Sequence, residues 1–166
     1  MGRLGIDDLE SMKGAVLDKT GQSELLAAQT ECSFVFLRED GWPGAVVMNY
    51  LMDDGVFWLT AVEARLHVRA IADDARVSIV VSSAGTQLKG RRMVAIRGLA
   101  EVHRDPVVVG RWLTRFSSSL RPQDPEAMRE LLDSPNRVIL EVRPVAVSAS
   151  HDHRKIKRVR TRDPGR

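Results

Sequence analysis

The first third of the chain alternates between short apolar runs and turn signals. Three runs rich in β-branched and aromatic residues predict strands, over residues 32–37, 42–52 and 56–60. Asp-Gly pairs at 40–41 and 54–55 lie between these runs, and this dipeptide is the strongest short-range signal for a tight β-hairpin. The pattern therefore predicts three strands joined as an antiparallel meander.

Helical spacing of apolar residues marks four segments of the chain, over residues 22–30, 63–74, 105–120 and 124–134. Ser23 with Glu24 is expected to cap the first of them. The last two open with Asp followed by Pro, which are favoured at the N-cap and at the first helical position. Helices are therefore expected both before and between the strands.

Three further apolar runs predict strands over residues 76–83, 92–104 and 136–150. Gly98 inside the second of these runs indicates a β-bulge. Six short, mostly antiparallel strands favour a barrel over an open sheet. The predicted fold is therefore mainly β, a six-stranded antiparallel barrel with peripheral helices.

The chain of 166 residues is expected to form a single domain over residues 1–150, followed by a basic, flexible tail over residues 151–166. Cys32 is the only cysteine, which excludes an intramolecular disulfide. No apolar run approaches the ~18 residues of a membrane span. The N-terminal residues, MGRLGIDDLESMKG, contain no apolar signal core. A cytoplasmic protein that does not contact membranes is expected.

The sequence pI of about 9.4 would suit a nucleic-acid-binding protein, but the basic residues are unevenly distributed. Seven of the 25 Lys and Arg residues lie between Arg154 and Arg166, where Asp163 is the one acidic residue. The rest of the chain carries 18 basic and 21 acidic residues. We therefore expect a slightly acidic body with a solvated basic end, and no nucleic-acid partner.

Residues 85–92, GTQLKGRR, contain two glycines five positions apart and then two arginines. A phosphate-binding P-loop needs Lys and then Ser or Thr after its second Gly, with a helix to follow. Arg91 and Arg92 occupy those positions here, and the residues after them are strand-like. The segment is therefore predicted as a hairpin loop, whose arginines could grip a phosphate through their planar guanidinium groups.

Four stretches, taken in order, resemble the pyridoxamine 5′-phosphate oxidase-like flavin-binding proteins. They are EDGWPGAVVMNYLMDDGVFWLT, HVRAIADDARVSIVV, GRRMVAIRGLAEVHRD and RVILEVRPVAVSASHDHRKI. The resemblance covers roughly residues 25–157 and implies the split β-barrel of the FMN-binding type. His67 stands where that family has Lys, Ala70 where it has Asn, and Ala75 where it has Pro.

The resemblance implies that the barrel binds FMN, with the cofactor at the interface of a homodimer. It places the phosphate near Thr60, Arg65 and His67, with Arg91 or Arg92 approaching from the loop, and the flavin ring along residues 46–49. The full set of expected cofactor-binding residues is Val46, Val47, Met48, Asn49, Leu59, Thr60, Arg65, His67, Gln87, Arg91 and Arg92.

No nucleophile elbow is present, and no closed metal site is expected, because His151 and His153 lack further ligands at metal-binding spacing. A flavin carries the redox chemistry itself, so the protein needs no acid–base pair of its own. The resemblance implies two-electron, hydride-type oxidoreduction of a small organic substrate. Two alternatives use the same fold: reduction with the deazaflavin coenzyme F-420, and storage or sensing of a flavin or haem without turnover. The sequence indicates neither the substrate nor the electron donor.

Overall fold

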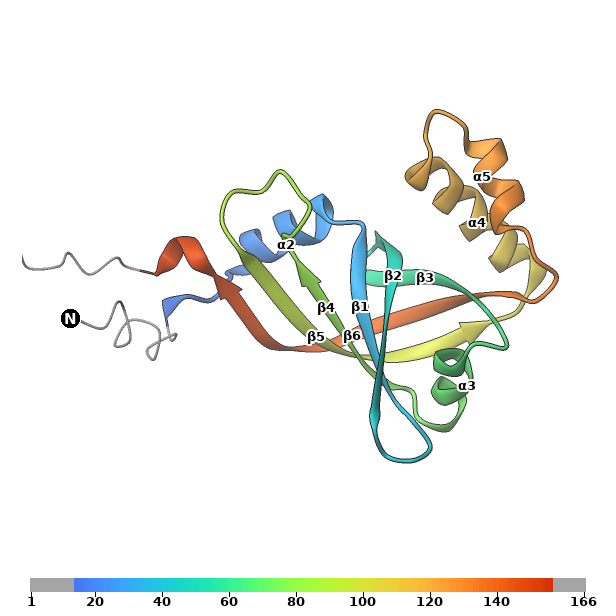
Figure 1. Ribbon diagram of the computed structural model, residues 1–166, viewed down its shortest axis with the longest axis horizontal. Helices are drawn as coiled ribbons and strands as arrows, with labels where there is room; N and C mark the ends of the chain where they lie inside the picture. The colour runs from blue at the N-terminus through green and yellow to red at the C-terminus, as the bar shows by residue number, and fades with distance from the viewer. Residues whose placement is uncertain (1–13, 157–166) are drawn as a thin grey trace, which may run out of the picture.

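Six antiparallel strands close one barrel, in which the strands are paired in the order β1-β2-β3-β6-β5-β4 and β4 returns to β1 (Figure 1). The computed structural model describes residues 14–156. The strands are β1 (Glu31–Leu37), β2 (Pro43–Asp53), β3 (Val56–Val62), β4 (Arg76–Ser82), β5 (Arg92–His103) and β6 (Arg137–Asp152). The predicted mainly β fold, a six-stranded antiparallel barrel, is confirmed.

The two Asp-Gly pairs form the tight turns of the meander. Gly41 has a φ of 80° in the β1–β2 turn, and Asp54 and Gly55 have φ of 47° and 77° in the β2–β3 turn. Asp54 and Gly55 thus form a two-residue hairpin turn of the favoured kind, which requires positive φ at both central residues. The β1–β2 turn is longer, and there Gly41 alone has a positive φ, which glycine adopts without a steric penalty. Local turn chemistry therefore sets where β1, β2 and β3 begin and end.

Four α-helices lie around the barrel in the part of the chain that the structure describes. They are α2 (Lys19–Ala28), α3 (Leu66–Asp73), α4 (Pro106–Leu120) and α5 (Pro125–Leu132). The two Asp-Pro signals are confirmed, since the side chains of Asp105 and Asp124 accept hydrogen bonds from backbone N–H groups in the first turns of α4 and α5. None of the described helices has the length and apolar character needed to cross a membrane.

The first helix begins three residues earlier than predicted, and the predicted cap is wrong. Asp18, not Ser23, accepts the hydrogen bond from the backbone N–H of Gly21. Ser23 lies inside the helix, where its Oγ donates to the carbonyl of Lys19. A serine can bond either a free N–H at a helix start or the carbonyl one turn back, and here the aspartate takes the first role.

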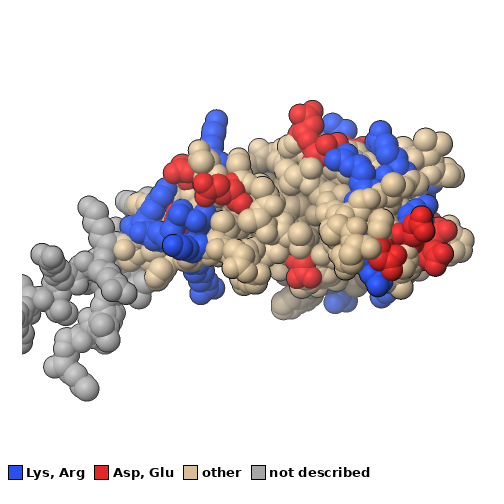
Figure 2. Space-filling view, turned by 90° about the horizontal axis from the view of Figure 1, so that it is seen from above, with Lys and Arg blue, Asp and Glu red and all other residues tan. Residues whose placement is uncertain are grey.

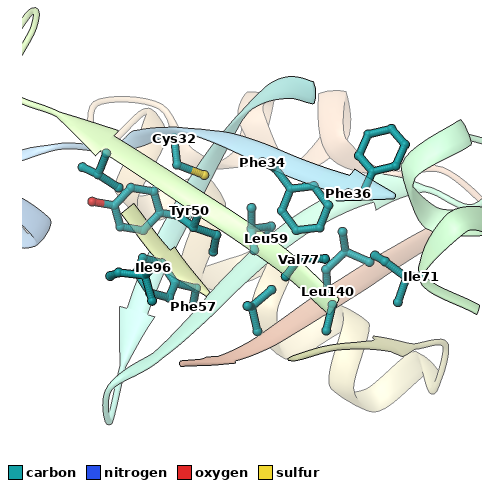
Figure 3. Close-up of a cluster of buried hydrophobic side chains, with 14 of the residues drawn as sticks. Cys32, Phe34, Phe36, Tyr50, Phe57, Leu59, Ile71, Val77, Ile96 and Leu140 are labelled. Atoms are coloured by element: carbon teal, nitrogen blue, oxygen red, sulfur yellow. The ribbon is translucent and has the colours of Figure 1, made fainter. Parts of the chain in front are cut away.

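The barrel interior is a packed apolar core (Figure 3). Alternate residues of each strand point inward, so that β1 contributes Phe34 and Phe36 while β3 contributes Phe57 and Leu59. Phe34, Phe57 and Leu59 are completely shielded from solvent. Burying side chains of this size stabilises the fold by about 1.5–3 kcal/mol each.

A second apolar cluster fixes α4 against the outside of the barrel. Trp112, Leu113 and Phe116 of α4 are buried together with Ile139 of β6. The indole ring of Trp58, which projects outward from β3, stacks on Trp112 with ring centroids 4.1 Å apart. The hairpin of α4 and α5 is thereby held beside β3 and β6.

The barrel is split between β2 and β3. These strands pair only from Tyr50–Leu59 to Asp53–Val56, next to their connecting turn. On the other side of Tyr50, β2 follows β1 as far as Pro43, and after Leu59, β3 follows β6 as far as Val62. The two strands therefore separate, and a slot opens in the barrel wall.

Charged side chains of both signs gather at the two ends of the face shown in Figure 2, with few charges between them.

β6 continues to Asp152, two residues beyond its predicted end. The carboxyl group of Asp152 is buried, and hydrogen bonds from Arg154 hold its pKa at about 2. A short 3-10 helix, η2 (His153–Lys155), follows. Residues 157–166 of the predicted tail lie outside the described residues, so the division into a domain and a tail stays a prediction.

Gly98 lies at a register shift between β5 and β6, as expected for a bulge. A Cβ at this position would lie 2.6 Å from Cγ1 of Val142 and 2.9 Å from the carbonyl oxygen of Arg143. We expect Gly98→Ala to lower the free energy of unfolding by about 1–3 kcal/mol, because backbone must move to admit the methyl group. Urea denaturation followed by circular dichroism measures the change.

The matched control is Gly110→Ala in α4, where a Cβ would meet no atom within 4 Å. Alanine is the better helix former by about 1 kcal/mol, so this variant should be at least as stable as the wild type. Equal stability of the Gly98 variant and the wild type would contradict the close approach of β5 and β6.

Candidate functional site

A cavity of about 620 Å³ lies where β2 and β3 separate. Its walls come from β2, from the end of β3 and from the start of α3. The lining also includes Glu31 at the start of β1, Leu120 at the end of α4, Leu132 at the end of α5 and Arg137 at the start of β6. The volume falls in the range of small-molecule and cofactor sites, so the split in the barrel offers a ligand-sized space.

Seven of the eleven predicted cofactor-binding residues line this cavity: Val46, Val47, Met48, Asn49, Thr60, Arg65 and His67. Leu59 is adjacent to Thr60 but points into the barrel core. Gln87, Arg91 and Arg92 lie at the β4–β5 loop, which Figure 1 shows beside α2 and away from α3. Within one chain the structure does not bring these four side chains to the cavity, and their contact with a cofactor stays a prediction.

Arg92 has a partner of its own. Its side chain is 4% exposed, and its Nη1 donates to Oε2 of Glu24 at 2.8 Å. This ion pair joins the start of β5 to α2. The guanidinium of Arg92 therefore contributes to the packing of α2, and its charge is already compensated within the chain.

The β2 side of the cavity carries a free strand edge. The backbone N–H of Tyr50 donates to the carbonyl of Thr30 at 3.0 Å, so the backbone of Tyr50 faces β1. Because backbone direction alternates along a strand, the N–H and C=O groups of Val47 and Asn49 face the opposite way. β3 does not pair with these two residues in the described chain. The wall thus offers backbone donors and acceptors beside apolar side chains.

His67 is a buried residue of the cavity lining. The rings of Phe34 and Phe36 each lie 6.0 Å from its imidazole, which is 7% exposed. Burial lowers the pKa of His67, and the nearby charge of Arg65 lowers it further. Its Nε2 is buried and has no hydrogen-bond partner among the described residues. Burial therefore favours the uncharged imidazole, which keeps one polar atom for a ligand.

Arg65 and Arg137 bring two guanidinium groups to the same cavity. The cross-strand pairing of Val62 with Arg137 places the latter beside the end of β3, and its Nε donates to the carbonyl of Leu132 at 2.8 Å. Burial lowers the pKa of Arg137, and the charge of Arg65 lowers it further. Two cations near enough to oppose each other's charge favour binding of an anion between them.

The N-terminus of α3 also favours binding of an anion in this part of the cavity. Arg65 is its N-cap residue and makes no side-chain cap, and Leu66 and His67 of the first turn line the cavity. N–H groups in the first turn have no partner inside a helix, and the helix dipole is positive at this end. The cavity can therefore hold an elongated ligand, with an anionic group at α3 and a flat apolar body along β2.

Sequence reasoning missed Arg137 and Glu31, which also line the cavity. Arg137 is the first residue of the last strand, and only the β3–β6 register brings it near Arg65. Glu31 lies opposite Asn49 in the β1–β2 pairing. The predicted hairpin already placed β1 beside β2, so Glu31 could have been inferred from its position opposite Asn49. No local sequence pattern indicated Arg137.

Comparison with solved structures extends the description of the fold. A conserved hypothetical protein from Mycobacterium tuberculosis is 19% identical, with a TM-score of 0.70 over 92% of this chain and 95% of its own. The haem storage protein HutZ from Vibrio cholerae is 11% identical, with a TM-score of 0.62 over 77% and 90%. At these identities the likeness shows the fold alone. A structure named F420 reductase is 26% identical, with a TM-score of 0.57 over 76% and 94%.

A search of curated proteins found no match. The family model described as pyridoxamine 5′-phosphate oxidase, in contrast, matches residues 22–151. The matched segment contains all six strands of the barrel up to His151 and every residue that lines the cavity. This protein therefore belongs to the pyridoxamine 5′-phosphate oxidase family, as its sequence motifs indicated.

Proposed function

We propose that this protein is an FMN-dependent oxidoreductase that performs two-electron, hydride-type chemistry on a small organic molecule. One observation carries the proposal: Arg65, Arg137 and the N-terminus of α3 meet at one end of a ligand-sized cavity in the split barrel. Membership of the pyridoxamine 5′-phosphate oxidase family supports the choice of a flavin.

The residues at the α3 end fit the phosphate of FMN. A guanidinium group can bond two phosphate oxygens at once, and such charge-assisted bonds are the strong ones. A phosphate between Arg65 and Arg137 would also offset the repulsion between the two cations. The Nε2–H tautomer of His67 has a donor without a partner among the described residues, and a phosphate oxygen would satisfy it.

The β2 wall fits the flavin ring. Val46 and Met48 offer apolar contact, and the outward-facing backbone groups of Val47 and Asn49 can bond the pyrimidine edge. FMN, when bound, supplies the hydride-type redox chemistry. The chain's own part is then to hold the phosphate, orient the ring against β2 and keep water from its buried side.

We also propose that a second copy of the chain covers the open side of the cavity. Outward residues of five neighbouring strands form a cross-strand row without charge: Val47, Ser33, Val80, Ala95 and Ala149. Val47 is 69% exposed and belongs to both the row and the cavity lining. Small uncharged side chains on the barrel surface suit close packing against an identical face.

The deazaflavin coenzyme F-420 is the second candidate. The 26% identity to a structure named F420 reductase favours it. This coenzyme carries an acidic tail, which exposed cations such as Lys89, Arg91 and Arg69 could attract. Arg92 does not join them, because it is buried against Glu24.

Arg65→Ala and Arg137→Gln should each weaken FMN binding by about 1.5–3 kcal/mol, because each removes a charge-assisted bond to the phosphate. Fluorescence titration of the protein with FMN measures the dissociation constants. Arg69→Ala is the matched control, since Arg69 is exposed on the same helix and does not line the cavity. Unchanged affinity in both cavity variants would contradict the phosphate site.

Parallel titrations with FMN, F-420 and haemin decide the cofactor. The proposal expects FMN to bind most tightly, and riboflavin, which lacks the phosphate, to bind more weakly than FMN binds either single Arg variant. Preference for F-420 would transfer the function to the deazaflavin reductases of the same fold. Tighter binding of haemin than of FMN and F-420 would contradict both proposed oxidoreductase functions, the FMN-dependent one and the F-420-dependent one.

Occupation of the site should raise the pKa of His67. In the free protein this pKa lies below 6.5, because burial disfavours the imidazolium. The unfolded chain then binds the proton more readily, so His67 lowers stability as pH falls below about 6.5. Arg65→Gln should raise the pKa but leave it below 6.5, because the charge of Arg65 is the smaller cause.

NMR titration of the histidine ring signals, with and without FMN, measures the pKa of His67. The His67→Gln variant identifies its resonance. A bound FMN dianion favours the imidazolium and should shift the titration to higher pH. A His67 signal that is insensitive to FMN, while FMN is bound, would place the phosphate elsewhere.

Ala95→Glu should convert the dimer to a monomer, because it buries a carboxylate within the uncharged row, between Val80 and Ala149. Light scattering during size-exclusion chromatography gives the mass. Ser118→Glu, at an exposed position of α4, introduces the same charge away from the row and should leave the dimer intact. A monomeric wild type would refute the dimer.

A further inference from the structure

We infer that Glu101, His103 and Glu141 form a binding site for a divalent first-row transition ion, best suited to Zn²⁺, on the outer face of β5 and β6. One ligand atom from each side chain lies within 4.8 Å of the others. The site lies outside the cavity between β2 and β3, and the inference does not depend on the proposed flavin chemistry.

Strand geometry brings the three side chains together. Glu101 and His103 are two residues apart on β5, so both project from the same face of the sheet. Glu141 of β6 is the direct cross-strand partner of Glu101. Glu141 is far from Glu101 and His103 in the sequence, so the three residues show no motif with the spacing of metal ligands.

The imidazole of His103 is already held in position. Its Nε2 lies 2.7 Å from Oε2 of Glu141. On its other side the ring of Trp58 lies 5.8 Å away, and Trp58 is itself stacked on the buried Trp112. A ligand whose rotamer is fixed by its neighbours loses little freedom when it binds a metal.

The charges of the cluster also favour a cation. Like charges directly opposite each other on neighbouring strands are destabilising, and Glu101 faces Glu141 in this way. Glu141 is 5% exposed, so its carboxylate receives little help from water. Arg143 forms an ion pair with Oε1 of Glu141, and no ion pair of Glu101 is found among the described residues. A divalent ion between Glu101, His103 and Oε2 of Glu141 would replace the His103–Glu141 hydrogen bond and compensate both acids.

The donor set points to the class of ion. Mg²⁺ and Ca²⁺ prefer all-oxygen ligands, whereas one imidazole with two carboxylates is typical of Zn²⁺ and related transition ions. Three protein ligands leave a tetrahedral ion one open position. Glu101 is exposed, so that position would face solvent and hold a water molecule.

Isothermal titration calorimetry of tag-free protein with Zn²⁺ tests the site. The wild type should bind one equivalent, and Glu101→Gln should weaken binding about tenfold or more, since it removes a charged ligand without changing the side-chain size. Because Glu101 is exposed, this variant is expected to fold normally. Arg143→Met should tighten binding, since the guanidinium competes with the ion for Glu141.

His153→Ala is the control for the other histidine pair, His151 and His153, whose rings lie 6.4 Å apart at the end of β6. It should leave Zn²⁺ affinity unchanged. Absence of saturable Zn²⁺ binding by the wild type would overturn the inference. Equal Zn²⁺ affinity of the wild type and the Glu101→Gln variant would also overturn it, whether or not the His153→Ala variant binds Zn²⁺ more weakly.

Discussion

β2 and β3 are held to each other less firmly than to their outer neighbours, and the cavity follows from that imbalance. β2 makes seven residue pairs with β1 but four with β3, while β3 makes six with β6. Each strand therefore follows its longer-paired neighbour once the short hairpin ends. Backbone groups on the parted edges lose their ladder bonds, and they need new partners once a ligand or a second subunit excludes water from the slot. A ligand with polar edges can supply those partners. The barrel thus carries its candidate site at the place where its own hydrogen bonding stops.

The α3 end of the slot is electrostatically unfavourable in the free chain. Arg137 is partly buried near another guanidinium, and His67 is kept neutral among phenylalanine rings. Each arrangement opposes folding slightly, since a charge or a donor is removed from water without a full replacement. The apolar core beneath, with Phe34 and Leu59 fully buried, supplies the stability that tolerates it. Unfavourable electrostatics at one place in an otherwise stable fold are expected at a functional site. Here a bound anion would relieve them, because it would compensate the two guanidinium charges.

Features set by neighbouring residues were predictable from the sequence, and features set by register were not. The Asp-Gly turns and the Asp-Pro helix starts depend on a few adjacent residues, so those element boundaries were found. The seven predicted residues that line the cavity lie within residues 46–67, close to one hairpin and one helix start. Arg137 escaped because its nearness to Arg65 depends on how β6 aligns with β3. Arg92 looked available for a ligand because the sequence does not show that α2 presents Glu24 to it.

Val47 links the two proposals for the slot. It is a member of the uncharged row that a second copy would cover, and it also lines the cavity that the cofactor would fill. A partner packed on the row restricts β2 and shields the cavity from water, which strengthens the electrostatic contacts within it. Coupling between two binding events is reciprocal, so a cofactor that binds the dimer more tightly must also tighten the dimer. The dependence of the apparent cofactor affinity on protein concentration would therefore report on both interactions at once.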